Sequence, residues 1–497
     1  MVNTDSHKKS SRTGVSRRRF VQAAGASGIT VGLAGCLGGD GNGNGNGNGN
    51  GEVDGVEDAP SDAIVISADA DLTEIEDDIQ EALWDAGLDN DIEIAMQAGD
   101  FETDSRRDQY TSALEAGRSS PDIFMMDSGW TIPFIVRDQL LNLEENLSSD
   151  ILDKVRSEYL PSTIDTSEDP ETGDLYGLPF FPDFPVMQYR RDLVEDAGYD
   201  TSGWDTTPVS WQEFSEIAAD VQSQNEDDVD YAFTTQAAPY EGLACCTFNE
   251  TMSSFGGAFF GGVENLFGPV GDRPVTVEEE PVLETLRAMR AMIHGQDDEH
   301  AAAGYEQIAP EAILQWREEE ARAPFTDGNA VFHRNWPYSV VINGEDDAFG
   351  EDLGTMPLPY GIEEGQSEYD GLGGSRAALG GWNLAVNPNG DNIEDTLAVL
   401  EAFADESVMQ RVFELNGNIP PIVSVMEDAD RDELGTIGRY VDTLEYAGET
   451  TVARPVTDVW PQQAQFVYQE VHDVYTQTSS PEEGMSNLAN FLEQTEE

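Results

Sequence analysis

Basic residues are scarce in this chain, and lysine is almost missing. The 497 residues include 98 acidic and only 25 basic side chains, which gives a formal net charge of −73 at pH 7. Lys154 is the only lysine beyond the first nine residues. Nucleic acid is bound by concentrated positive charge, so this composition argues against a nucleic-acid partner.

The acidic excess predicts an adaptation to the solvent rather than a basic partner. So many like charges repel each other in dilute buffer and loosen a compact fold. At about 1 M salt the screening length falls to roughly 3 Å, which removes most of this repulsion. The composition is therefore typical of a protein from an extreme halophile. It also makes any pair of carboxylates weak support for acid–base catalysis, whereas the few arginines are informative.

Cysteine and histidine are also rare, with three and five residues. Cys245 and Cys246 are adjacent, and a bridge between neighbours is strained, so we expect two small buried side chains rather than a redox or metal site. No Cys/His cluster has the spacing of a zinc site, and the sequence predicts neither metal nor cofactor. After residue 36 no run of 18 uncharged apolar residues occurs, so the body is not expected to cross a membrane.

The first 36 residues have the pattern of an export signal. Three arginines at 17–19 precede a Gly/Ala-rich apolar run that ends in Leu-Ala-Gly and Cys36. Paired arginines before such a run are typical of twin-arginine export, and the ending resembles the lipobox of lipoproteins. A short helix with a chance arginine cluster is the alternative. Residues 37–60, with Gly-Asn repeated at 41–50, predict a flexible linker that reaches roughly 27 Å.

The body alternates strand and helix patterns, which predicts parallel βαβ units and an α/β fold. Buried strands are expected at 63–66, 92–96, 122–126 and 382–386. Ser480, followed by Glu483, has the pattern of a capping box at the start of a last helix. About 437 residues follow the linker, more than one core usually supports, so two lobes are expected.

Several stretches together resemble one family, the extracellular solute-binding lipoproteins of sugar ABC importers, especially the trehalose- and maltose-binding type, here in a haloarchaeal-like form. The resemblance covers residues 62–497 and keeps the order of the family's motifs. The stretches that carry it are 104–110, 113–114, 121–130, 176–183, 189–193, 328–332, 335–338, 380–384, 416–420 and 453–457.

The resemblance implies a two-lobed fold like that of periplasmic binding proteins, with a ligand cleft between the lobes. Lobe 1 is expected to comprise 61–178 and 377–445, and lobe 2 to comprise 179–376 and 446–497. It further implies a non-enzymatic, monomeric protein, lipid-anchored outside the cytoplasmic membrane. Such a protein captures a sugar, such as maltose or trehalose, and delivers it to ABC permease subunits.

Sugar recognition accounts for the residue types of the implied site. Carboxylates and guanidinium groups hydrogen-bond to hydroxyls, and aromatic rings cover the C–H faces of a pyranose. The resemblance implies nine ligand-binding residues: Glu74, Arg106, Asp127, Phe181, Asp183, Trp336, Gly381, Trp382 and Arg454.

Some of these residues also have a simpler structural explanation. Asp127 ends a strand, where open α/β sheets bind ligands, but it could simply cap the next helix. Arg107 could take the place of Arg106, and either could be a surface arginine. The family usually has a polar-tipped aromatic at Phe181, so a hydrogen bond to the sugar is lost there. Gly381 is expected to bring a backbone amide close to the sugar.

Two other functions remain open at this level. A binder of glycerol-3-phosphate would need clustered cations or a glycine-rich loop at a helix start, and the glycine-rich stretch 371–376 lacks that context. A secreted glycoside hydrolase would need two carboxylates across a sugar cleft, and the abundance of acids prevents exclusion by counting. No hydrolase motif occurs in the sequence.

Overall fold

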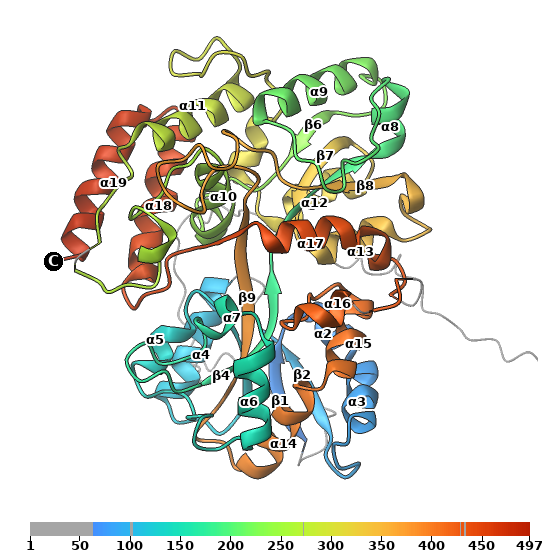
Figure 1. Cartoon of the computed structure of the whole chain (residues 1–497), viewed down its shortest axis with the longest axis vertical. Helices are drawn as coiled ribbons and strands as arrows, with labels where there is room; N and C mark the ends of the chain where they lie inside the picture. The colour runs from blue at the N-terminus through green and yellow to red at the C-terminus, as the bar shows by residue number, and fades with distance from the viewer. Residues whose placement is uncertain (1–62, 100–102, 272, 428, 432–433) are drawn as a thin grey trace, which may run out of the picture. The chain divides into compact units, whose positions relative to one another are not determined.

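Alternating buried strands and amphipathic helices form the body of the computed structural model, which describes residues 63–99, 103–271, 273–427, 429–431 and 434–497 (Figure 1). The described residues all belong to the unit Gly55–Glu497. The predicted export signal, Cys36 and the linker lie outside the described residues. In the described part of the chain, no helix is long and apolar enough to cross a membrane.

The first sheet has the strand order β10-β9-β3-β1-β2, with β4 also paired to β9. β1 is parallel to β2 and β3, as the βαβ pattern predicts, whereas β9 is antiparallel to β3 and β4. The strands are β1 (Ile64–Ala68), β2 (Ile94–Ala98), β3 (Ile123–Asp127), β4 (Gly177–Asp183), β9 (Ala377–Val386) and β10 (Thr451–Ala453).

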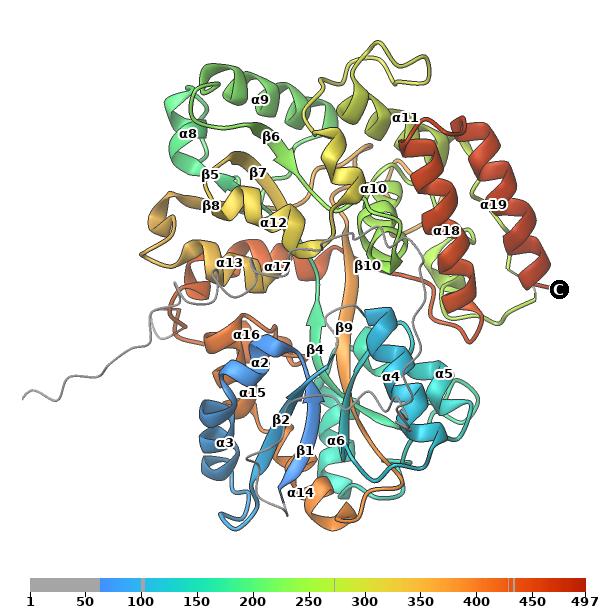
Figure 2. The ribbon, with the colours of Figure 1, turned by 180° about the vertical axis from the view of Figure 1, so that it is seen from behind.

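Both faces of this sheet are covered by helices, which is why its strands read as continuous apolar runs. Along β3, Ile123 and Met125 belong to one hydrophobic cluster, while Phe124 and Met126 belong to another on the opposite face. Figures 1 and 2 show the helices of this half on both sides of the sheet: α2 (Ala70–Glu74), α3 (Glu76–Asp85), α4 (Thr103–Glu115), α5 (Thr131–Ile135), α6 (Ser149–Glu158), α7 (Pro161–Ile164), α14 (Ile393–Phe403), α15 (Glu406–Asn416) and α16 (Val423–Glu427).

The second sheet has the order β6-β7-β5-β8 and forms the centre of the largest hydrophobic core. Its strands are β5 (Val186–Arg190), β6 (Tyr231–Thr234), β7 (Ala330–Asn335) and β8 (Leu353–Met356). The helices of this half are α8 (Arg191–Asp196), α9 (Trp211–Gln224), α10 (Phe248–Ser254), α11 (Glu280–His294), α12 (Glu318–Thr326), α13 (Pro337–Gly344), α17 (Val441–Glu449), α18 (Trp460–Tyr475) and α19 (Pro481–Thr495).

Short helical turns complete the second half. One is a π-helix and the others are 3₁₀ turns: η2 (Leu243–Thr247), η3 (Val263–Asn265), η4 (Glu311–Gln315), η5 (Gly350–Asp352) and η6 (Ile437–Tyr440). The predicted cap of the last helix is confirmed, because the Ser480 hydroxyl accepts a hydrogen bond from the Glu483 amide at 3.1 Å.

The chain passes between the two cores along β4 and β9, which lie side by side in Figures 1 and 2. Phe181 packs in the core of the first sheet and Phe184 in that of the second, so the first passage falls at 181–184. Leu379 packs in the second core and Leu384 in the first, so the next falls at 379–384. The sequence suggested passages near 178 and 376. The sequence suggested a third passage near 445. Val425 still packs in the core of the first sheet, whereas Leu434 and Tyr440 pack in that of the second, so the chain has already passed over.

A buried ion pair fastens α11 to the C-terminal helices. Arg290 Nε and Nη2 donate to Asp298 at 2.8 Å each, and Arg290 Nη1 donates to the carbonyls of Val474 and Ser479 at 3.0 Å. Burial raises the pKa of Asp298, but hydrogen bonds from Arg290 and a backbone amide outweigh it and lower that pKa to about 2. Since the folded-state pKa lies below the ordinary 3.8, this contribution to stability is complete above pH 4 and is lost as the pH falls towards 2.

Replacing Arg290 by Met is therefore expected to lower the free energy of unfolding by about 3–5 kcal/mol, because Asp298 stays buried without its partner. Urea unfolding at neutral pH in concentrated KCl measures this. The exposed pair of Arg431 with Asp442, at 2.7 Å, is the matched control. Arg431→Met should cost less than about 1 kcal/mol, and equal losses in the two variants would contradict the assignment.

Candidate functional site

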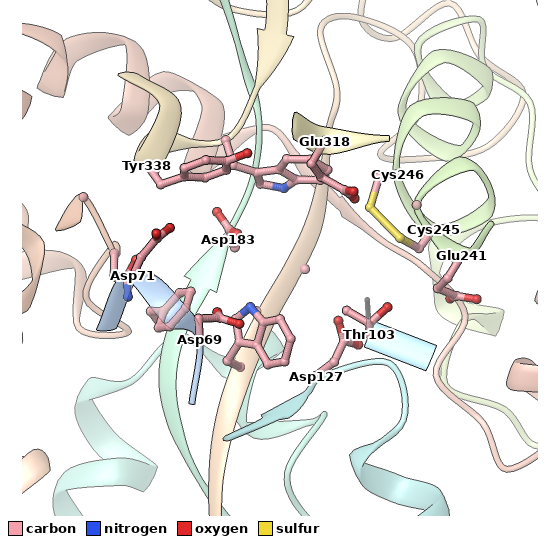
Figure 3. A pocket seen from close by; sticks show the side chains of 18 of the residues that line it. Asp69, Asp71, Thr103, Asp127, Asp183, Glu241, Cys245, Cys246, Glu318 and Tyr338 are labelled. Carbon is pink, nitrogen blue, oxygen red and sulfur yellow. A yellow bond between two sulfur atoms is a disulfide. The ribbon is translucent and has the colours of Figure 1, made fainter. Parts of the chain in front are cut away.

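A cavity of about 1120 Å³ lies where the ends of first-sheet strands meet loops of the second half. Figure 3 shows side chains from both halves facing it, with Tyr338 and Glu318 across from Asp69 and Asp127. Seven of the nine residues predicted for ligand binding line this cavity: Asp127, Phe181, Asp183, Trp336, Gly381, Trp382 and Arg454.

Strand pairing brings four of these residues together although they are far apart in sequence. Trp382 on β9 lies opposite Asp127 on β3 and opposite Phe181 on β4. Two residues on, Asp183 pairs with Gly380. The carboxyl ends of β3 and β4 therefore meet the middle of β9 at the cavity, as the strand-end argument predicted for Asp127.

Gly381 lines the cavity and also has a structural role. Its φ of +142° is unfavourable for residues with a side chain, and a Cβ there would lie 2.8 Å from the carbonyl oxygen of Phe181. The Gly381 carbonyl accepts a hydrogen bond from the Ser128 amide at 2.9 Å. The glycine is thus required for the close approach of β4 to β9, in addition to lining the cavity.

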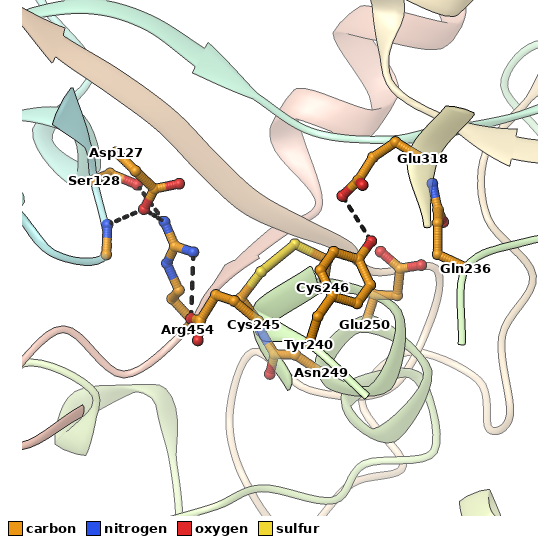
Figure 4. Close-up of a disulfide and its surroundings, with 12 residues drawn as sticks. Asp127, Ser128, Gln236, Tyr240, Cys245, Cys246, Asn249, Glu250, Glu318 and Arg454 are labelled. Carbon is orange, nitrogen blue, oxygen red and sulfur yellow. Dashed lines mark hydrogen bonds and ion pairs between the residues drawn. A yellow bond between two sulfur atoms is a disulfide. The ribbon is translucent and has the colours of Figure 1, made fainter. Parts of the chain in front are cut away.

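Arg454 ties the two halves together beneath the cavity. It follows β10, is 2% exposed, and forms an ion pair with Asp127 at the end of β3 (Figure 4). Its Nη2 also donates to the Ser128 hydroxyl at 3.1 Å, and Nη1 lies 3.8 Å from Glu241. Gly129 leaves room for the guanidinium, since a Cβ there would lie 2.3 Å from it.

Each of the two cavity tryptophans has an arginine over its ring. The guanidinium carbon of Arg106 lies 4.8 Å from the ring centre of Trp382, and that of Arg334 lies 4.1 Å from Trp336. Both arginines are 1% exposed. Arg334 is held by Glu250, with Nε and Nη2 donating at 2.7 and 2.6 Å. Cation–π contacts of this kind fix the orientation of an indole.

Two predicted residues do not line the cavity. Arg106 is covered by Trp382 and forms an ion pair with Asp69, so it supports the site from behind. Glu74 is exposed at the end of α2. Asp69, which precedes α2, and Asp71 in its first turn line the cavity instead.

Several lining residues were missed from the sequence. In so acidic a chain nothing distinguished Asp69, Asp71, Glu241 and Glu318 from the other acids. Tyr338, Gly380 and 416–418 lie within motifs that carried the family resemblance, and this was the signal available for them. The missed residues are Asp69, Ala70, Asp71, Thr103, Tyr240, Glu241, Gly242, Cys245, Cys246, Glu318, Tyr338, Gly380, Asn416, Gly417 and Asn418.

The expectation of two unlinked cysteines is wrong in the structure. Cys245 and Cys246 form a disulfide on η2, and both residues line the cavity (Figure 4).

Carboxylates dominate the charge of the cavity wall, and burial changes their pKa values. Burial raises the pKa of Asp183 to about 8, and the negative charges of Asp69 and Asp127 add to this while Arg334 opposes it. Burial, followed by neighbouring carboxylates, raises the pKa of Asp71 to about 6. At neutral pH the Asp183 carboxyl is therefore mostly protonated, and it can donate as well as accept a hydrogen bond.

Glu318 is also held in the wall by a hydrogen bond, and burial raises its pKa. It accepts from the Tyr240 hydroxyl at 2.6 Å, and Tyr338 donates to Glu319 at 2.9 Å. No group of three or more potential metal ligands occurs among the described residues. The site as built offers oxygen acceptors, two indoles and one guanidinium, which is a set for hydrogen bonding and stacking.

The raised pKa of Asp183 predicts a pH-dependent stability. Since its folded-state pKa of about 8 lies above the ordinary 3.8, the folded protein binds the extra proton, and this carboxyl lowers stability increasingly as the pH rises from 4 to 8. Asp183→Asn should therefore gain melting temperature relative to wild type over that range and level off above it. The exposed Asp200→Asn should give a constant difference from pH 5 to 9. Parallel curves for wild type and Asp183→Asn would contradict the assignment.

The chain is similar to a known protein family and to a curated protein. The family model described as bacterial extracellular solute-binding protein matches residues 69–410. The chain is 28% identical over 401 residues to a probable ABC transporter-binding protein of Deinococcus radiodurans, covering 79% of this chain and 84% of that one.

Two solved structures have a similar fold. The maltose-bound MalE3 of T. maritima is 26% identical, with a TM-score of 0.70, over 87% of this chain and 99% of that chain. A solute-binding protein of Thermotoga lettingae bound with α-D-tagatose is 18% identical, with a TM-score of 0.69, over 88% and 100%. The expected two-lobed α/β fold is thus confirmed. Since the family model matches well over half of the chain, the protein belongs to the bacterial extracellular solute-binding protein family.

Proposed function

We propose that this protein is the substrate-binding component of an ABC importer and that it captures a neutral di- or oligosaccharide outside the membrane for delivery to the permease. The observation that carries this proposal is the pair of tryptophans in one cavity, Trp336 from the second half and Trp382 from the first, among oxygen acceptors. Indoles cover the C–H faces of a sugar, and carboxylates accept from its hydroxyls.

The charge of the cavity favours a neutral ligand. Six carboxyl side chains line it: Asp69, Asp71, Asp127, Asp183, Glu241 and Glu318. Arg454 is the only basic side chain in the lining that the structure describes, and it is already paired with Asp127. A phosphate or carboxylate ligand would bring further negative charge to this wall without a free cation to meet it. This weighs against glycerol-3-phosphate.

The T. maritima relative supports a sugar ligand. That protein, 26% identical to this chain, was solved with the disaccharide maltose. Two indoles in one cavity can each cover one ring of such a ligand. A ligand held by groups from both halves would favour a closed arrangement, because only that arrangement makes both sets of contacts.

The remaining parts of the proposal rest on the sequence. Export by the twin-arginine route and a lipid on Cys36 would hold a monomeric body at the outer face of the membrane. The acidic composition supports a halophilic, haloarchaeal-like source. The proposed lobe boundaries at 178 and 377 lie within a few residues of the points where the chain leaves one hydrophobic core for the other.

A panel of sugars tests the proposal. In concentrated KCl, maltose, trehalose and longer glucosides should raise the melting temperature, whereas glycerol-3-phosphate should not. Recovery of intact sugar distinguishes a binder from a glycoside hydrolase, which would release glucose. A panel in which no sugar binds, or in which sugars are cleaved, would overturn the proposal.

Trp382→Ala should weaken affinity for the best sugar at least about tenfold, or about 1.4 kcal/mol, because one stacking plane is lost. Isothermal calorimetry measures the affinity, and circular dichroism checks the fold. Trp84→Ala is the matched control, since Trp84 is partly buried on α3 and does not line the cavity. Unchanged affinity in Trp382→Ala would remove this indole from the site.

The melting temperature should also rise steeply with KCl, because the formal charge of −73 repels itself less when screened. Scanning calorimetry across KCl concentrations, with no sugar present, measures this. A melting temperature independent of KCl would contradict the halophilic interpretation.

A further inference from the structure

The Cys245–Cys246 disulfide is part of the cavity wall. Both residues line the cavity, and each retains a small exposed fraction, 5% and 7%. Figure 3 shows the bond on the wall beside Glu241, on the far side of the opening from Asp71. The chain has only one other cysteine, Cys36 in the predicted export signal, so both cysteines of the body are placed at this cavity.

The disulfide continues an apolar surface that includes one of the stacking tryptophans. Cys245, Cys246, Trp336 and Ala378 form one buried hydrophobic cluster, and Tyr338 packs against it. Carboxylates dominate the rest of the wall, so this cluster is the apolar side of the second half of the site. A sugar that stacks on Trp336 would therefore extend over the neighbouring sulfur atoms.

A disulfide suits such a surface better than two thiols do. The joined sulfurs carry no S–H donor, are polarizable, and are held in one arrangement by the bond between them. Two separate thiols could each rotate about χ1, and ordering them on binding would cost conformational entropy. The linked pair thus presents a fixed, flat, apolar face to the C–H side of a pyranose ring.

We propose that the Cys245–Cys246 disulfide is a ligand-contacting subsite, which packs against the C–H face of a sugar ring next to the ring stacked on Trp336. This inference rests on the proposed sugar-binding function. It adds a residue pair to the site and makes affinity depend on the oxidation state of that pair.

Reduction provides the first test. A dithiol such as dithiothreitol transfers two electrons to the disulfide, the S–S bond breaks, the two sulfurs take the dithiol's protons, and the dithiol closes to its own cyclic disulfide. The full chain is used with Cys36→Ser, so that Cys245 and Cys246 are its only cysteines. Reduction should lower affinity for the best sugar of the panel at least about fivefold in calorimetry.

Substitution provides the second test. The double variant Cys245→Ala with Cys246→Ala should lose affinity to a similar extent, and dithiothreitol should then have no further effect. Leu243→Ala is the matched structural control, because Leu243 lies on the same π-helical turn, is fully buried and does not line the cavity. It should lower the melting temperature but change affinity less than twofold.

The outcomes separate this inference from the proposed function. If no sugar binds the oxidised wild type, the proposed function fails, and the subsite fails with it. If sugar binds equally well to wild type, reduced protein and the double alanine variant, the function stands and the subsite is overturned. Two free thiols, counted in the unreduced protein by thiol titration, would overturn the subsite whichever sugar binds.

Discussion

The passage of β9 from one core to the other is the constraint on which the rest of the structure depends. Its first residues, Ala377 and Leu379, pack in the core of the second sheet, and Leu384 and Val386 pack in that of the first. One strand thus connects the two cores, and Trp382 lies on it at the point where they meet. Two further contacts lie next to Trp382: the close approach of β4 to β9 at Gly381, and the buried Arg454–Asp127 ion pair.

Arginine placement follows from the scarcity of positive charge. In a chain with so few basic residues, Arg106, Arg334 and Arg454 are nearly fully buried, and each pairs with a carboxylate at or next to the cavity. Burying a guanidinium is costly unless its hydrogen bonds are met, and a highly acidic chain supplies the partners readily. Three of these acids, Asp69, Asp127 and Glu250, thereby hold the arginines of the site in place.

The sequence was sufficient for the parts of the structure that depend on local pattern. Long apolar runs marked the buried strands, and the family resemblance marked both Asp127 and Trp382, although their pairing across β3 and β9 appears only in the structure. Local pattern could not choose between Asp69, Asp71 and Glu74, because these three acids have the same chemistry. The start and the turn of α2 decide which of them faces the cavity. It also could not assign the segment after Val425 to a core, because its apolar stripe suits either one.

The arginine over each indole limits the number of indole faces that a ligand in this cavity can reach. A tryptophan has two faces, and at Trp336 and Trp382 a guanidinium occupies one of them. Each indole therefore has one face left for a ligand, so a bound molecule can stack on at most two indole faces in this cavity. Any further apolar contact would have to come from another part of the wall, such as the Cys245–Cys246 disulfide.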